Sequence, residues 1–167
     1  PVFVSSSMAV FQVGFNLYTD LNKANAAAEA DSSKQIVLSH SGILAAGTYK
    51  ISKGVNLLIP FDSANTATFG DEPECTMTYA APTMYSCLTM ADGAVLNCYG
   101  NINVNATQLA SSTRTAGRVC GAYGAIQMTS GYQIKLKSGS ALYAYGYIGG
   151  EGLVCGESRS KVYQFMQ

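Results

Sequence analysis

Apolar and polar residues alternate with a period of two through much of the segment between Ser130 and Gly156. Ile134 and Leu136 alternate with polar neighbours, and the alternation returns after a Ser-Gly-Ser turn at 138–140. A period of two is typical of a β-strand with one buried face and one solvent-exposed face. Gly and Ser interrupt the pattern every few residues, so the strands are short. Short strands joined by tight turns favour a solenoid of stacked coils over a meander of hairpins.

The alternation around residues 142–148 assigns three tyrosines to one face. The opposite face carries Leu142, Ala144, Gly146 and Ile148. If that apolar face is buried, Tyr143, Tyr145 and Tyr147 stand outward on one strand, where aromatic rings can stack on sugar rings or contact a protein partner. Two alternatives remain open: an ordinary outer surface covered by a neighbouring loop, and an inverted register in which the tyrosines fill the core.

One segment, 18–30, has the period of an amphipathic helix. It is rich in Ala, the best helix former, and its apolar positions recur at spacings of three and four: Leu17, Leu21, Ala24 and Ala28. Thr19 or Asp20 can serve as the N-cap, and the polar run 31–33 ends the helix. Because its apolar stripe is weak, the helix is expected to lie across one end of a larger β-structure.

An internal repeat points to stacked coils. The sequence from Leu88 to Gly93 matches the sequence from Ile126 to Gly131 at an offset of 38 residues (126 − 88). The register continues, with Leu96 against Ile134 and Cys98 against Leu136. Without the polar loop between the copies, each copy has about the length of one solenoid turn, on the order of 20 to 25 residues.

These patterns predict an all-β fold, a single-stranded right-handed parallel β-helix (β-solenoid) with an N-terminal capping α-helix. Residues 1–34 would hold an N-terminal strand and the capping helix, and residues 35–167 the β-helix. Its first strands are predicted at 35–39, 47–51 and 55–59, the last of them closed by Pro60. Excursion loops are expected near 61–85 and 105–122.

Three segments also carry a family resemblance: GTYKISKGVNLLIPFDSANT, YSCLTMADGAVLNCYGNINVNA and GAYGAIQMTSGYQIKLKSGSALYAYGYIGGEG. They resemble the right-handed parallel β-helix modules of large surface or secreted proteins from Gram-positive, gut-type bacteria. The resemblance covers roughly residues 11–167 and implies that fold and an extracellular or cell-surface location, with no established activity. The chain departs from the family in its five Cys and in stopping at Gln167, where such a helix would normally continue.

Composition narrows the function classes for this chain of 167 residues. Charged residues make up 12% and the formal net charge is zero, whereas sites for nucleic acid or anionic membranes normally show a basic excess. No apolar run approaches the roughly 18 residues of a membrane span. The prediction is therefore one domain that neither binds nucleic acid nor inserts into a membrane.

The five cysteines are Cys75, Cys87, Cys98, Cys120 and Cys155. None lies in a CxxC pair, which argues against a zinc ribbon, and the odd number leaves at least one thiol unpaired in a monomer. Buried free thiols are one expectation, because Cys often serves as a small apolar core residue. Disulfides are the other, and the pairs to inspect first are Cys75–Cys87 and Cys87–Cys98.

Candidate catalytic and metal-binding residues are few. His40 is the single histidine and is interpreted as a polar turn residue after a strand, so a His-rich metal site is excluded. The acidic residues Asp62, Asp71, Glu72 and Glu74 match no calcium-loop spacing and are interpreted as a solvated loop. Polysaccharide-cleaving β-helix enzymes would combine carboxylates with Arg or Lys, but no carboxylates have a spacing comparable to that of Arg114, Arg118 and Arg159. No catalytic residue, metal or cofactor is therefore predicted.

The leading functional prediction is a non-enzymatic structural or adhesive module of a bacterial cell-surface or secreted protein. It would bind a glycan or a protein partner through Tyr143, Tyr145 and Tyr147. One alternative is a carbohydrate-active domain resembling a polysaccharide lyase or hydrolase. Glycoside hydrolysis needs at least two neighbouring carboxylates. Another is a self-assembling solenoid subunit that associates end to end through its C-terminal coil.

Overall fold

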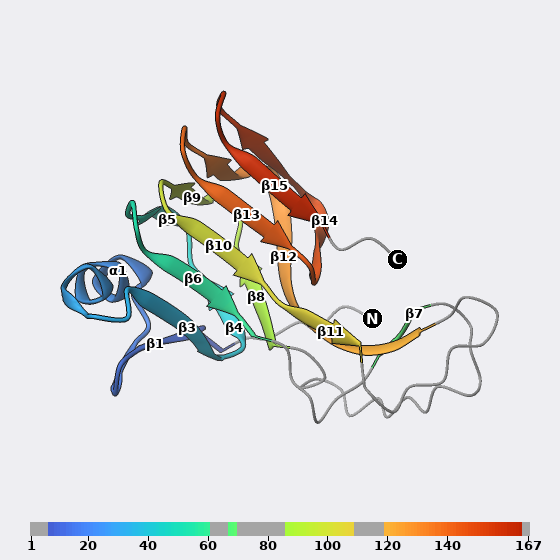
Figure 1. Ribbon diagram of the computed structural model, residues 1–167, viewed down its shortest axis with the longest axis horizontal. Helices are drawn as coiled ribbons and strands as arrows, with labels where there is room; N and C mark the ends of the chain where they lie inside the picture. Colours follow the sequence, from blue (N-terminus) through green and yellow to red (C-terminus); the bar gives the residue numbers. More distant parts are fainter. Residues whose placement is uncertain (1–6, 61–66, 70–85, 109–118, 165–167) are drawn as a thin grey trace.

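The strands of the protein form two sheets whose buried side chains meet in one core. The structure is a computed structural model, which describes residues 7–60, 67–69, 86–108 and 119–164. Along the seven-stranded sheet the order is β15 (Lys161–Gln164), β13 (Ala141–Ala144), β10 (Asn101–Val104), β6 (Asn56–Ile59), β3 (Gln35–His40), β1 (Val10–Val13) and β2 (Asn16–Tyr18). Figure 1 shows most of these strands in front of the second sheet.

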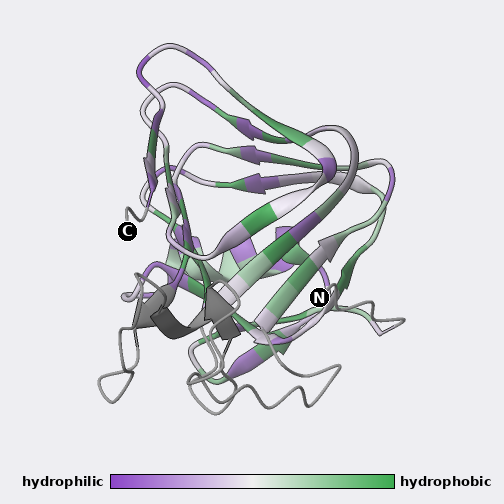
Figure 2. Cartoon of the chain, turned by 90° about the vertical axis from the view of Figure 1, so that its right-hand side faces the viewer, coloured by the Kyte–Doolittle hydropathy of each residue, from purple (hydrophilic) through white to green (hydrophobic). Residues whose placement is uncertain are grey.

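The second sheet has eight strands built around the long strand β12 (Val119–Leu136). Its main path is β4 (Gly42–Leu44), β8 (Ser86–Met90), β12, β9 (Ala94–Cys98) and β5 (Gly47–Ile51). The remaining strands all pair with β12: β7 (Ala67–Phe69), β11 (Ala106–Gln108) and β14 (Tyr147–Gly156). Seen at right angles to Figure 1, the strands of the two sheets surround a common interior (Figure 2).

The prediction of a single-stranded right-handed parallel β-helix is wrong. The strands are divided between two sheets that contain antiparallel as well as parallel pairs. At one end of the seven-stranded sheet, β1 pairs antiparallel with both β2 and β3. In the second sheet, β7 and β11 pair antiparallel with β12. Part of the physical reason is a chain reversal between β1 and β2, where Gly14 has a φ of 57°, a conformation that glycine adopts without a steric penalty.

The internal repeat, in contrast, predicted real neighbours. Leu88 of β8 is the ladder partner of Ile126 of β12, at the predicted offset. Further along the same strand, Ile134 pairs with Leu96 and Leu136 with Cys98, both in β9. The matching segments therefore lie in adjacent parallel strands. The offset of the repeat equals the register between these strands, although the predicted architecture is wrong.

The predicted excursion loops contain β7 and β11, which pair with the first part of β12. Figure 1 shows β11 and this part of β12 extending away from the rest of the two sheets. The acidic residues Asp62, Asp71, Glu72 and Glu74 lie outside the described residues, as do Arg114 and Arg118.

Helix α1 (Leu21–Ala30) lies where the sequence predicts it. Asp20 is its N-cap and accepts a hydrogen bond from the Asn22 backbone N–H at 2.9 Å. The helix ends at Ala30, and Asp31 is its C-cap, with a backbone N–H that donates to the Ala28 carbonyl. The carboxyl of Asp31 accepts hydrogen bonds from the side chain and backbone of Ser33, which lower its pKa. Among the described residues, no helix is long and apolar enough to cross a membrane.

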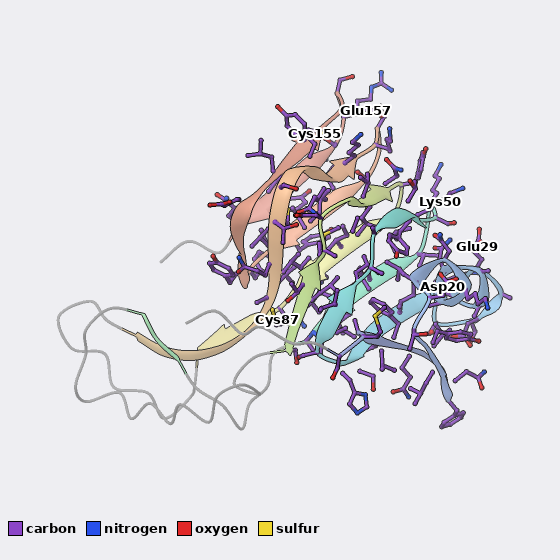
Figure 3. The ribbon with its side chains drawn as sticks, turned by 180° about the vertical axis from the view of Figure 1, so that it is seen from behind. Asp20, Glu29, Lys50, Cys87, Cys155 and Glu157 are labelled. Atoms are coloured by element: carbon purple, nitrogen blue, oxygen red, sulfur yellow. The ribbon has the colours of Figure 1, made fainter. Side chains whose placement is uncertain are left out.

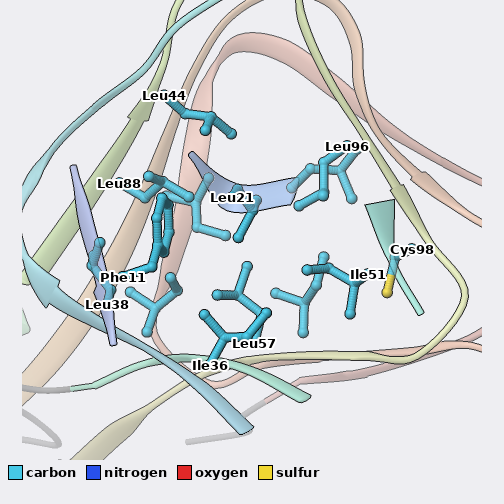
Figure 4. Packing of buried hydrophobic residues seen from close by; sticks show 14 of the residues in the cluster. Phe11, Leu21, Ile36, Leu38, Leu44, Ile51, Leu57, Leu88, Leu96 and Cys98 are labelled. Atoms are coloured by element: carbon cyan, nitrogen blue, oxygen red, sulfur yellow. The ribbon is translucent and has the colours of Figure 1, made fainter. Parts of the chain in front are cut away.

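The buried face of α1 covers one end of the core. Its fully buried apolar residues are Leu21, Ala24 and Ala28, as their spacing predicts. Leu17 was assigned to the same stripe, but it lies in β2 and is 57% exposed. Leu21 packs with residues from both sheets, such as Phe11 and Leu96 (Figure 4). The helix therefore joins the two sheets at the end where β1 and β2 lie.

Three turns with one backbone pattern lead from the eight-stranded sheet into the seven-stranded sheet. In each, a backbone N–H donates to the carbonyl three residues earlier: Val55 to Ser52, Ser140 to Lys137, and Ser160 to Glu157. The third position of each turn has a positive φ, which favours glycine. Gly54 and Gly139 occupy it in the first two turns, with φ of 85° and 87°, but Arg159 occupies it in the last, with φ of 70°.

Candidate functional site

The three predicted tyrosines do not share one strand. β13 ends at Ala144, and the next strand, β14, begins at Tyr147. Between them, the backbone N–H groups of Tyr145 and Gly146 both donate to the Val104 carbonyl, at 3.1 and 2.8 Å. A Cβ at Gly146 would clash with the backbone of the neighbouring strands, so only glycine fits at this corner. The chain therefore passes from one sheet to the other in the middle of the predicted row.

Two of the three tyrosines nevertheless lie together on the outside of the seven-stranded sheet, where they meet Tyr163 of β15. The rings of Tyr143 and Tyr163 are stacked, with centroids 4.9 Å apart and planes 11° apart. Tyr145 is tilted by 58° against Tyr143, with a centroid distance of 6.0 Å. Tyr145 is 36% exposed and Tyr163 40%. We call these three residues the tyrosine cluster.

Ladder register explains why the stacked pair forms. Tyr143 and Tyr163 are directly opposite each other in the parallel pair β13–β15. Side chains opposite each other on the same face of a sheet are close enough to interact. The same positions in successive strands form an outer row across the sheet: Val37, Leu58, Asn103, Tyr143 and Tyr163. No member of this row is charged.

The alternate positions form an inner row that faces the core: Ile36, Leu57, Ile102, Leu142 and Val162. The first four are at most 2% exposed. Burial of this row fixes the register of the strands, because a slip of one residue would move every side chain to the opposite face. The outward direction of Tyr143 is therefore a consequence of the burial of Leu142.

Tyr147, the third predicted residue, is separate from the cluster. It lies at the start of β14 in the other sheet and is 45% exposed. A side chain at Gly149 would clash with the Tyr147 phenol, so the ring lies over this glycine. The predicted row of three tyrosines on one strand is therefore wrong. All three side chains are at least partly exposed, but the surface that Tyr143 and Tyr145 share is formed with Tyr163 in place of Tyr147.

Tyr163 was missed because its short strand has an unremarkable composition. A signal was present in the sequence, however. The segment SGSALYA at 138–144 aligns with SRSKVYQ at 158–164, an offset of 20 residues (163 − 143) that matches the ladder register of β13 and β15. Comparing the two segments would have placed Tyr163 beside Tyr143.

A cavity of about 310 Å³ lies near the cluster, on the inner side of the sheet. β13 and β15 supply Leu142, Ala144, Val162 and Gln164 to its lining. The other sheet, with the turn after it, supplies Leu136, Ile148, Val154, Cys155, Gly156 and Ser160. The cavity therefore lies between the ends of the two sheets, and most of its lining is apolar.

The described carboxylates are spread over the molecule. Asp20 caps α1 and Glu29 belongs to it, and both lie far from Glu157 at the opposite end of the molecule (Figure 3). Glu157 pairs with Lys137 at 3.7 Å, and its other oxygen accepts from the Ser138 backbone N–H at 2.9 Å. Among the described residues, no group of three or more His, Cys, Asp or Glu side chains could hold a metal ion.

The described thiols are free. Cys87 and Cys98 are buried and free, in agreement with the expectation of buried free thiols, and Cys87 takes part in neither of the two alternative disulfides. Burial raises the pKa of the Cys87 thiol and raises that of Cys98 to about 12. Cys155 is also free and partly exposed. Cys75 lies outside the described residues, as does the side chain of Cys120.

His40 is the last residue of β3 and is exposed. Its Nδ1 lies 3.3 Å from the Ser39 hydroxyl, a contact between neighbouring residues.

Comparisons of the chain with protein-family models, with curated proteins and with solved structures find no match. The resemblance to modules of bacterial surface proteins therefore rests on the sequence motifs alone, and the fold that it implies is not the fold observed.

Proposed function

We propose that the protein is a non-enzymatic structural and adhesive module that binds a neutral glycan through the tyrosine cluster. The observation that carries the proposal is the Tyr143–Tyr163 stack, with Tyr145 tilted against it on the outside of a sheet. Stacking and the ladder hold the rings in place before a ligand arrives, which lowers the entropy cost of binding. An extracellular or cell-surface location is part of the proposal and is supported only by the motif resemblance.

The chemistry of the cluster suits a sugar. Aromatic rings offer apolar surface to the C–H groups of a pyranose ring, and phenolic hydroxyls donate hydrogen bonds to sugar hydroxyls and accept them. The outer row that ends in the cluster carries no charge. A neutral glycan is therefore favoured over an acidic one, which would need cationic partners.

Binding measurements on single-tyrosine variants test the proposal. A glycan array would identify a ligand, and calorimetry would measure its affinity for the parent protein and for Tyr145→Ala. We expect a loss of about tenfold, which corresponds to about 1.4 kcal/mol and is the size of a good aromatic contact. Because Tyr145 is partly exposed, the melting temperature should hardly change.

Tyr132→Ala is the matched control, since Tyr132 is 56% exposed and takes no part in the cluster. Its glycan affinity should equal that of the parent. Equal losses in both variants, or an unchanged affinity in Tyr145→Ala, would contradict the assignment. If the array shows no glycan binding while Tyr145→Ala weakens the binding of a protein partner, the same rings form a protein–protein contact instead.

The competing function is polysaccharide cleavage by a lyase or a hydrolase, and hydrolysis requires two carboxylates flanking the same bond. The same array ligands, incubated with the protein, would show this activity as new reducing ends. The proposal predicts that none appear.

A further inference from the structure

The edge strand β15 differs from every other strand of the inner row. It pairs with β13 on one side, and the described residues place no strand on its other side. Its inner-row residue, Val162, is 52% exposed, whereas its neighbours Leu142 and Ile102 are 2% and 0% exposed. The side chain thus occupies a core position without the cover that the other core positions have.

The cavity of about 310 Å³ beneath Val162 belongs to the same feature. Its apolar walls come from both sheets, with Leu142 and Val162 on one side and Ile148 and Val154 on the other. An added layer that covered this end would bury apolar surface, which is favourable at about 25 cal/mol per Å².

β15 lacks several of the features that keep edge strands from pairing. Short length, lysines, prolines, inward-pointing charges and bulges usually protect an exposed edge. β15 is four residues long (KVYQ) and carries Lys161, but it contains no proline, and its inward-pointing residue Val162 is uncharged. The formal net charge of the chain is zero, so two copies would not repel each other through net charge.

We propose that two copies of this chain associate through β15, antiparallel, about a twofold axis that places Tyr163 opposite its own counterpart. Residues opposite each other in an antiparallel pair point to the same face. Centring the pair on Tyr163 satisfies this rule and sets Val162 of each copy against Gln164 of the other, both directed towards the cavity. The inference does not depend on glycan binding.

The tyrosine stack indicates that the strand which pairs with β15 comes from a second copy of the chain. Directly opposite side chains in an antiparallel pair have Cβ atoms about 4.5–5.5 Å apart. In the outer row, the rings of Tyr163 and Tyr143 already stack across two adjacent strands, with their centroids 4.9 Å apart. A second copy supplies the next tyrosine at the same separation, so the column continues through the twofold axis. The contact is self-complementary and closes after two copies.

Sedimentation or light scattering over a range of protein concentrations tests the proposal. The parent should shift from its monomer mass of 17.5 kDa to twice that mass as concentration rises, and no further. Val162→Lys should stay monomeric at every concentration, because it places a charge in the contact, directly beside the central Tyr163 pair. The variant should keep its melting temperature as a dilute monomer, since Val162 is half exposed there.

Leu17→Lys is the matched control. Leu17 is an exposed apolar residue of β2, the edge strand at the other end of the same sheet. This variant should dimerise like the parent. Mass that keeps growing with concentration and is lost in both variants would mean head-to-tail assembly and would overturn the twofold arrangement. A parent that stays monomeric throughout would overturn the proposal as well.

A covalent test fixes the register. Tyr163→Cys, made in a Cys155→Ser background, should form a disulfide-linked dimer under mild oxidation, because the two introduced thiols face each other across the axis. The Cys155→Ser parent should form much less of this dimer. If cross-linking is no greater for Tyr163→Cys than for that parent while the mass still doubles, the copies meet elsewhere and the proposed register is wrong.

Discussion

The two ends of the seven-stranded sheet close the core in different ways. At one end, α1 lies over the sheets, and Leu21, Ala24 and Ala28 are fully buried against them. At the other end, Val162 occupies the same kind of inner position in β15 but is half exposed above a cavity. The comparison shows that alternation orients a side chain, while an added layer decides how much of it is buried.

The largest expected difference between the ends is in the cost of truncating an apolar side chain. Leu21→Ala should lower the free energy of unfolding by about 2–5 kcal/mol, because it removes fully buried atoms and leaves a cavity. Val162→Ala should cost less than about 1 kcal/mol, since half of the side chain is already exposed. Chemical denaturation at low protein concentration measures both, and equal losses would contradict the comparison.

A smaller effect is expected from the polar contact that fastens α1. The Asn25 amide donates to the Ser52 hydroxyl and accepts from the Ser52 backbone N–H, each at 2.9 Å, in a buried setting. Asn25→Ala should cost about 1–3 kcal/mol, because it leaves the Ser52 groups buried without partners.

Asn22→Ala is the control for this contact. Asn22 makes the same two kinds of bond, to the Thr48 carbonyl and the Lys50 backbone N–H, but in an exposed setting where water can replace them. It should cost about 0.5–1 kcal/mol. Denaturation curves in which Asn22→Ala is the more damaging substitution would show that burial does not set the energy of these contacts.

How far could these features have been predicted from the sequence? The helix and an N-cap at Thr19 or Asp20 follow from capping chemistry and periodicity, and the outward direction of Tyr143 follows from alternation once Leu142 is taken as buried. The pairing of Leu88 with Ile126 followed from the repeat. The antiparallel pairing of β1 with β3 brings distant segments together and leaves no periodic trace, so the architecture was predicted wrongly. The break at Gly146 was missed because a glycine inside an alternating pattern is compatible with a continuous strand.

Two of the turns that lead into the seven-stranded sheet can be compared by substitution. The two changes should alter the free energy of unfolding by about 1 kcal/mol each, in opposite directions. Gly139 and Arg159 hold equivalent turn positions with φ of 87° and 70°. A residue with a Cβ pays roughly 1–2 kcal/mol in the left-handed region. Gly139→Ala should therefore destabilise the protein and Arg159→Gly should stabilise it, although the added glycine freedom of the unfolded chain reduces the gain.

Thermal melting of the two turn variants checks this prediction. A Cβ at Gly139 would meet no other atom within 4 Å, so backbone strain is the only cost. Shifts of the same sign in the two variants would show that the turns are not equivalent.

The smallest effect concerns the thiols and leaves stability unchanged below about pH 9. Cys98 is buried and its pKa is raised to about 12, so its contribution to stability is full below its usual value near 9 and is lost as the pH rises towards 12. At pH 8, iodoacetamide should modify the partly exposed Cys155 and spare Cys87 and Cys98. Peptide mass spectrometry resolves the sites, and rapid native labelling of Cys98 would show that the core is open.

Hydrogen exchange at low protein concentration tests the difference between the two ends most directly. Peptides that cover β6, inside the sheet, should exchange slowly, and peptides that cover β15 should exchange at least about a hundredfold faster, which corresponds to about 2.7 kcal/mol. The β15 peptides should gain protection as the protein concentration rises. Equal and concentration-independent protection of β6 and β15 would contradict the account of one closed end and one open end.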